Sequence, residues 1–224
     1  MFLGLFVGLS LQSLIAGMEN TALLERLIML IGEVAILVPP LFILSQRKIS
    51  PTQVLPLKKV SPITVGMSVL LIGGVIGLVS VFEVLVLPYY PVPEFLKQMD
   101  ATLFDGGVLA NVILLSAAII AAPIVEEFLF RGLLQQSLFY HFGSQLPAMV
   151  IPTVVFALFH IGYLFYFPAM VELIALGLLL AWLMVKTGNM LIPMLTHALF
   201  NLSAFSGLFL GVDEETSTLA DLGW

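Results

Sequence analysis

The sequence predicts an all-α fold, a polytopic transmembrane bundle of about seven spans within a range of six to eight. Of the 224 residues, 60% are hydrophobic and only 10% are charged, and the mean hydropathy is +1.13. A soluble domain carries about 25% charged residues, and a chain of this size still has a surface to solvate. We therefore expect lipid to solvate most of the protein, as a single integral membrane domain over residues 1–224.

The predicted spans are apolar runs that end at glycine, proline or charged residues. A helix needs about 20 apolar residues to cross a bilayer. Prolines at 39 and 40 are expected to kink the second run near its end. The seven runs are 1–17, 23–44, 61–87, 107–125, 146–163, 168–185 and 190–210.

The loop charges predict an orientation in the membrane. The connection after the second run contains Arg47, Lys48, Lys58 and Lys59 and no acidic residue. Lysine and arginine are enriched in cytoplasmic loops, so we expect this connection to face the cytoplasm. Alternation of the spans then places the connection at 131–144 on the same side.

Composition also excludes several classes of function. The chain has no cysteine, which rules out disulfides, thiolate metal sites and a cysteine nucleophile. No basic patch with interleaved aromatic residues is present, so nucleic acid is not an expected partner.

Ionisable and polar residues inside the apolar runs are the candidates for function. Each ionisable side chain at membrane depth costs at least about 2.5 kcal/mol and calls for a partner or a role. A shared cavity that water can enter would explain all of them together, with water as the nucleophile. His141 lies in a loop, where an interfacial role is expected. The candidate residues are Glu126, Glu127, Arg131, His160, His197 and Asn201.

The two adjacent glutamates are expected to have different roles. On a helix, Glu127 and Arg131 are four residues apart and can form an ion pair. Glu126 lies about 100° away around the helix and cannot share that pair equally. Two carboxylates in different environments can divide the roles of a fixed group and a general base. The alternative is that all three residues cap a helix at the membrane surface.

The histidines and the asparagine also allow two interpretations. His197 and Asn201 are four residues apart, so both project from one helix face and could donate hydrogen bonds to a developing oxyanion. The alternative is that they form hydrogen bonds between spans. A lone histidine such as His160 is more often a satisfied interior residue than a catalyst.

Three motifs resemble those of the CPBP intramembrane proteases, a family that includes type II CAAX prenyl endopeptidases and bacteriocin-processing or immunity proteins. Residues 122–132, APIVEEFLFRG, are similar to the EExxxR motif and its flanks. Residues 156–160 match FxxxH, and residues 197–201 match HxxxN, preceded by the lead-in at 187–193. The resemblance covers about residues 109–203.

The resemblance implies a helical membrane fold with an active site that opens toward the cytoplasm, in the plasma (inner) membrane. By family similarity, Glu126 and His160 would activate water, and His197 with Asn201 would form the oxyanion site. Glu127 and Arg131 would support this arrangement. The implied activity is hydrolysis of a peptide bond near the cytoplasmic membrane face by glutamate-activated water, and CAAX-type C-terminal processing is the family's best-known reaction.

Cofactor and partners are the remaining expectations. We expect catalysis without a metal, because the sequence has no HExxH motif. The alternative is a zinc site of Glu126, His160 and His197, since this family is often labelled metalloprotease. The expected partners are the lipid bilayer and a membrane-associated peptide or protein, which could be lipid-modified. Other functions left open are a non-catalytic transporter and a bacteriocin-immunity or scaffold protein.

Overall fold

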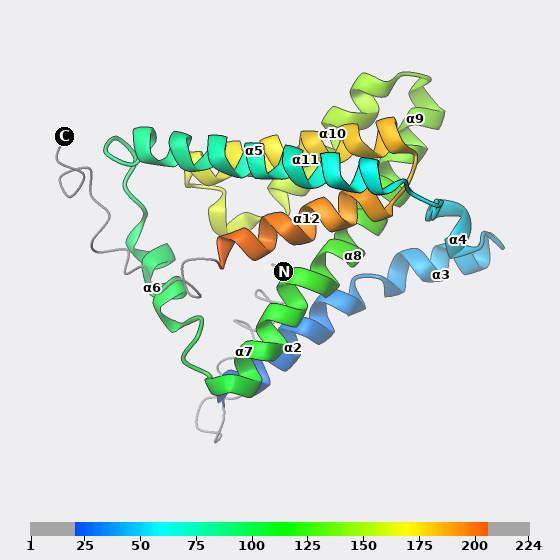
Figure 1. The fold of residues 1–224 in the computed structure, drawn as a ribbon. Helices are drawn as coiled ribbons and strands as arrows, with labels where there is room; N and C mark the ends of the chain where they lie inside the picture. The colour runs from blue at the N-terminus through cyan, green and yellow to red at the C-terminus, as the bar shows by residue number, and fades with distance from the viewer. Residues whose placement is uncertain (1–20, 206–224) are drawn as a thin grey trace.

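The computed structural model describes residues 21–205, and in this range the chain is helical and contains no strand (Figure 1). Four helical segments are long and apolar enough to cross a membrane: Thr21–Gln46, Pro62–Val86, Gly107–Phe142 and Phe167–Thr187. The predicted helical membrane fold is therefore confirmed, with four candidate spans in the described part of the chain. The first predicted run, 1–17, lies outside the described residues.

Two of the predicted runs form shorter helices than expected. They are α10 (Gln145–Leu158) and α12 (Leu191–Ala204), and each has 14 residues. Helices of this length are about 21 Å long, whereas the hydrocarbon core of a bilayer is about 30 Å thick. The apolar run that was expected to reach residue 163 ends earlier because the chain turns after Leu158 and forms the short 3-10 helix η3 (Ile161–Tyr163).

The prolines of the second run interrupt its helix, as expected. The segment consists of α2 (Thr21–Ala35) and α3 (Val38–Gln46), separated by a turn at residues 36 and 37. Pro39 and Pro40 occupy the first turn of α3. They have no N–H group with which to continue the hydrogen-bond ladder of α2, so the helix ends before them.

The third candidate span is one long helix with two π-helical segments. It runs through α7 (Gly107–Ser116), η1 (Ala117–Ala121), α8 (Ala122–Glu127), η2 (Phe128–Gln135) and α9 (Gln136–Phe142). The expected connection from residue 131 is therefore wrong, because the helix continues to Gly143, whose φ of 62° is favourable for glycine. π-Helical segments occur frequently at functional sites, and here two of them flank α8.

The remaining helices pack around this long segment. Helix α5 (Pro62–Val86) contacts α11 (Phe167–Thr187) and α12 through a core of Ile72, Leu176 and Leu180. Helix α2 contacts α7, and Figure 1 shows the two side by side. The outward face of α5 is strongly apolar, including Leu70. Large exposed apolar surfaces of this kind mark contacts with membrane or protein.

The connection between α3 and α5, which carries the four basic residues at 47, 48, 58 and 59, lies beside the turn between α11 and α12. We call it the basic connection. The Asn189 side chain donates a hydrogen bond to the backbone carbonyl of Lys58, and the backbone N–H of Met190 donates to the carbonyl of Pro56 over 3.0 Å. The basic connection follows α3 and contains the short helix α4 (Pro51–Val54). We call this end of the bundle, residues 47–59 with the turn at 187–190, the basic end.

Candidate active site

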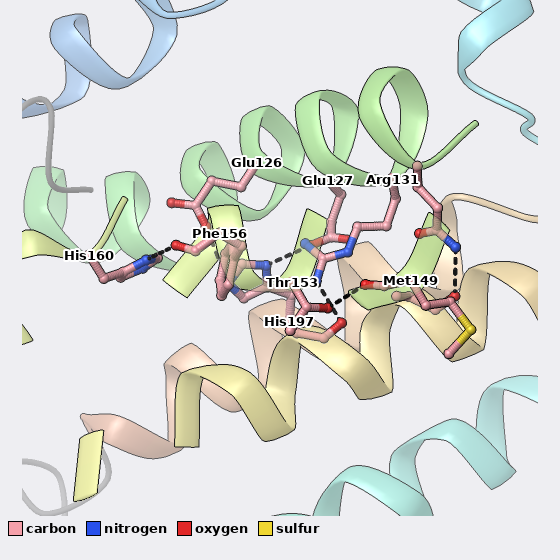
Figure 2. Close-up of polar contacts among 11 residues, drawn as sticks. Glu126, Glu127, Arg131, Met149, Thr153, Phe156, His160 and His197 are labelled. Atoms are coloured by element: carbon pink, nitrogen blue, oxygen red, sulfur yellow. Dashed lines mark hydrogen bonds and ion pairs between the residues drawn. The ribbon is translucent and has the colours of Figure 1, made fainter. Parts of the chain in front are cut away.

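The candidate residues come together in the interior of the bundle. Helix α8 and the start of η2 supply Glu126, Glu127 and Arg131, the end of α10 leads to His160, and α12 supplies His197. Figure 2 shows these side chains in a row, with His160 and Glu126 toward one end and Arg131 toward the other. Segments distant in sequence therefore build one polar cluster between apolar helices.

Glu127 and Arg131 form the expected ion pair, and the pair is buried. The Arg131 Nη1 atom lies 2.8 Å from Glu127 Oε1, and the two side chains are 1% and 0% exposed. Arg131 Nη2 donates a second hydrogen bond to the carbonyl of Gly177 on α11 over 3.0 Å. The alternative of a charged helix cap at a surface therefore does not describe this pair. A buried ion pair persists when good geometry and further hydrogen bonds offset its desolvation.

His197 is anchored to the same carboxylate. Its Nδ1 atom lies 3.0 Å from Glu127 Oε1. This oxygen therefore accepts hydrogen bonds from both the guanidinium and the imidazole. A carboxylate paired with arginine accepts hydrogen bonds only, which means that Nδ1 of His197 carries the hydrogen. The other ring nitrogen, Nε2, is then the one that can exchange a proton or donate to a substrate.

Glu126 faces this second nitrogen. Its Oε2 atom lies 3.5 Å from His197 Nε2, and its carboxylate also interacts electrostatically with His160. The residue is buried but keeps 8% of its surface exposed, in contrast to Glu127. The two adjacent glutamates thus have different surroundings: Glu127 is fixed between two donors, and Glu126 faces two imidazoles.

His160 is oriented by the turn that ends α10. Its Nδ1 atom lies 2.8 Å from the carbonyl oxygen of Phe156. Because a carbonyl can only accept, Nδ1 of His160 also carries the hydrogen, and Nε2 is the nitrogen that can accept a proton. The Phe156 ring packs against both imidazoles, with ring centroids 4.7 Å from His160 and 5.8 Å from His197. The same ring lies 5.1 Å from the Arg131 guanidinium carbon, so Phe156 holds the cluster together.

Asn201 makes a hydrogen bond between helices. Its Nδ2 atom donates to the backbone carbonyl of Ala118 in η1 over 2.8 Å. The π register of η1 pairs the N–H of Ala122 with the carbonyl of Ala117. In the same register the carbonyl of Ala118 would accept from the N–H of residue 123, but this residue is proline and has none. The Asn201 amide donates to this carbonyl instead. The oxyanion role of Asn201 stays a prediction, for which a second N–H of the amide is available.

The alternative zinc site is not supported by the geometry. Among the residues that the structure describes, no group of three histidine, aspartate or glutamate side chains is arranged to hold a metal ion. The set Glu126, His160 and His197 therefore does not fit a three-ligand zinc centre, and no step of the mechanism below uses a metal.

Sequence reasoning missed one residue of the cluster, Glu33 on α2. Its side chain is 1% exposed and interacts electrostatically with Glu126 and His197. The signal was present, because Glu33 lies in the middle of the apolar run 23–44. The criterion that selected Glu126, an ionisable group at membrane depth, selects Glu33 equally.

Comparison with known proteins finds a similarity over part of the chain. Residues 108–203 match the family model described as type II CAAX prenyl endopeptidase Rce1-like. No curated protein and no solved structure matches the chain. The matched segment extends from α7 to α12 and contains every candidate site residue except Glu33. Over this segment the match confirms the resemblance to type II CAAX prenyl endopeptidases.

Proposed function

We propose that this protein is an intramembrane endopeptidase in which Glu126 activates a water molecule. The observation that carries the proposal is the approach of Glu126 Oε2 to His197 Nε2, 3.5 Å apart, beside the buried Glu127–Arg131 pair that fixes the imidazole. A carboxylate next to an oriented imidazole, in a site lined by apolar helices, provides a base and a proton donor for hydrolysis.

The chemical steps follow from these positions. Glu126 accepts a proton from water, with His160 as a second polar group beside it, and the water oxygen adds to the peptide carbonyl carbon. His197 keeps its Nδ1–H on Glu127 and, when Nε2 also carries a proton, donates from Nε2 to the developing oxyanion. When the C–N bond breaks, the proton held by Glu126 passes to the leaving nitrogen.

The substrate class follows from the location of the site. A membrane-associated peptide or protein can reach a cluster enclosed by apolar helices, and a lipid-modified C-terminus of the CAAX type is one such substrate. Prenyl chains would share the apolar surroundings of the helices.

We further propose that the site opens toward the cytoplasm, in the plasma (inner) membrane. The support is the basic end, which the positive-inside rule assigns to the cytoplasm. The residue after Arg131 packs against this end, because a Cβ atom on Gly132 would lie 2.9 Å from the carbonyl oxygen of Val54. His160 follows the C-terminal end of α10, so its accessibility decides on which side the site opens. Because the chain has no cysteine, single cysteines at positions 58 and 160 can be labelled in intact cells with a membrane-impermeant maleimide. We expect no labelling at either position from outside the cell, and labelling at position 160 would reverse the assigned orientation of the site.

Cleavage of membrane peptides by the purified protein tests the function. We expect Glu126→Gln to lower kcat by about 10²- to 10⁴-fold, the usual contribution of a general base. Glu94→Gln is the matched control, because Glu94 is exposed on α6 (Glu94–Thr102) and pairs with Lys97 at the surface. Cleavage that persists in Glu126→Gln would exclude Glu126 as the base, and loss of activity after stringent chelation would restore the zinc alternative.

A further inference from the structure

Basic side chains without an acidic partner gather at the basic end. The chain has eight lysine and arginine residues. Three of them lie within 4 Å of a glutamate, in the pairs Arg26–Glu25, Lys97–Glu94 and Arg131–Glu127. The other five are at positions 47, 48, 58 and 59 and, in the last turn of α11, at position 186. None of these five forms an ion pair with a carboxylate of the residues that the structure describes, and the sequence has no acidic residue between positions 34 and 82.

The backbone at Lys48 is unusual for a lysine. Its φ is 56°, and among the described residues no other side-chain-bearing residue has a positive φ. Helix α3 ends here, because the N–H of Lys48 donates to the carbonyl of Ser45 over 3.0 Å. This left-handed conformation favours glycine or asparagine. A lysine that occupies it is expected where its charge has a role.

Lys58 and the start of α5 lie close to the end of α11. A Cβ atom on Gly188 would lie 3.4 Å from Lys58 Nζ, so the ammonium group is positioned beside the last turn of α11. Figure 1 shows α4 and the first turns of α5 at the same end of the bundle. Helix α5 has 25 residues and no acidic side chain in its first turn. The N-terminus of such a helix also favours a negative charge.

An exposed apolar stripe begins at the same place and runs along α5. It consists of Ile63, Met67 and Leu70, which are 75%, 67% and 77% exposed. Their spacings of four and three place them on one face of the helix. A soluble anion would match only the charges of this region, whereas a molecule with an anionic head and apolar chains matches the charges and the stripe together.

We propose that the basic end binds the headgroup of an anionic phospholipid, whose acyl chains lie along the stripe of Ile63, Met67 and Leu70. Each lysine or arginine near an anionic lipid raises its affinity about 5-fold. Lys58 and Lys59, which precede α5 directly, therefore give an expected preference of about 5- to 25-fold over a zwitterionic lipid. The inference goes beyond the proposed function and does not depend on peptide cleavage.

Quenching of tryptophan fluorescence by brominated lipids measures this preference. Trp182→Phe and Trp224→Phe remove both tryptophans of the chain, and a new tryptophan is then placed on α5 as Met67→Trp or, in a second protein, as Leu85→Trp. Leu85 is 64% exposed and lies near the other end of the same helix, so it is the matched control. Both proteins are reconstituted in phosphatidylcholine vesicles that contain brominated phosphatidylglycerol or brominated phosphatidylcholine at equal mole fraction. Because both leaflets have the same composition, the direction of insertion does not affect the comparison.

We expect brominated phosphatidylglycerol to associate about 5- to 25-fold more strongly than brominated phosphatidylcholine at Met67→Trp, and equally at Leu85→Trp. About 0.5 M NaCl should lower the preference, because salt screens exposed charges. Lys58→Gln with Lys59→Gln should reduce it to less than about 2-fold, whereas Lys97→Gln, which removes a paired lysine of α6, should leave it unchanged.

Three results would overturn the proposal. The first is equal association of the two lipids at Met67→Trp, and the second is the same preference at both reporters, which would show that the lipid is not bound at the basic end. Neither comparison needs a lysine variant, so both remain decisive if such a variant does not fold. The third is a preference that inorganic phosphate lowers more than NaCl of equal ionic strength, because the surface would then bind a soluble anion.

Discussion

Replacing Arg131 with methionine tests whether the buried ion pair determines both stability and catalysis. Methionine keeps much of the volume of the side chain but removes the donors to Glu127 Oε1 at 2.8 Å and to the carbonyl of Gly177 at 3.0 Å. Glu127 would then remain buried with only His197 as a partner. Removing one partner of a buried pair typically costs about 3–5 kcal/mol, because the remaining charge is uncompensated.

This cost corresponds to a large change in thermal stability. For chains of this length, about 1 kcal/mol shifts Tm by about 2–4 °C, so Arg131→Met should lower Tm by about 6–20 °C. The double variant Arg131→Met with Glu127→Gln should recover most of this loss, because no charge is left unpaired. Its kcat should stay low, since His197 would lose the carboxylate that holds its Nδ1–H.

Thermal unfolding in detergent, monitored by circular dichroism, measures these changes. Lys97→Met is the matched control: it breaks the Lys97–Glu94 pair, whose side chains are 56% and 73% exposed, and it should cost less than about 1 kcal/mol. A Tm within about 2 °C of the unmodified protein for Arg131→Met would refute the buried-pair reasoning. A double variant as unstable as the single one would refute its electrostatic cause.

Three further substitutions follow from close contacts and one hydrogen bond. Gly132→Ala would place a Cβ atom 2.9 Å from the carbonyl oxygen of Val54, so we expect a loss of about 1–3 kcal/mol in unfolding free energy from overpacking. Gly177→Ala would place a Cβ atom 2.8 Å from Thr153 Cγ2; it should destabilise to a similar extent, and Thr153→Ser, which removes that methyl group, should restore part of the loss. Asn201→Ala would leave the carbonyl of Ala118 without its donor and should cost about 1–3 kcal/mol in chemical denaturation.

The two glycine substitutions share one control, and Asn201→Ala has a second readout. Gly74→Ala in α5 meets no atom within 4 Å, so it should be neutral or stabilise the helix by up to about 1 kcal/mol. A similar loss in Gly74→Ala would show that helical glycines matter for reasons other than close contact. For Asn201→Ala, kcat measured below the unfolding transition separates the two interpretations: a fall of about 10²-fold supports the oxyanion role, and an unchanged kcat leaves only the contact between helices.

Local spacing was sufficient to predict part of the site. The ion pair between Glu127 and Arg131 follows from a separation of four residues on a helix, and the structure contains it. The division between Glu126 and Glu127 follows from the angle between adjacent residues. Contacts across the bundle did not follow from spacing. That His197 Nδ1 binds Glu127, and not Glu126, depends on how α12 packs against α8.

Hydropathy determined the class of protein and the positions of the apolar helices, because both depend on composition and on runs of adjacent residues. The number of predicted spans is not confirmed: the described residues contain four candidate spans, and hydropathy does not show where a helix turns, as after Leu158. Tertiary structure alone decided that α2, outside the family match, brings Glu33 to the site. It also decided that Asn201 donates a hydrogen bond to the carbonyl of Ala118 in η1, for which Pro123 has no N–H. Both depend on helices distant in sequence lying side by side, and no local pattern encodes that distance.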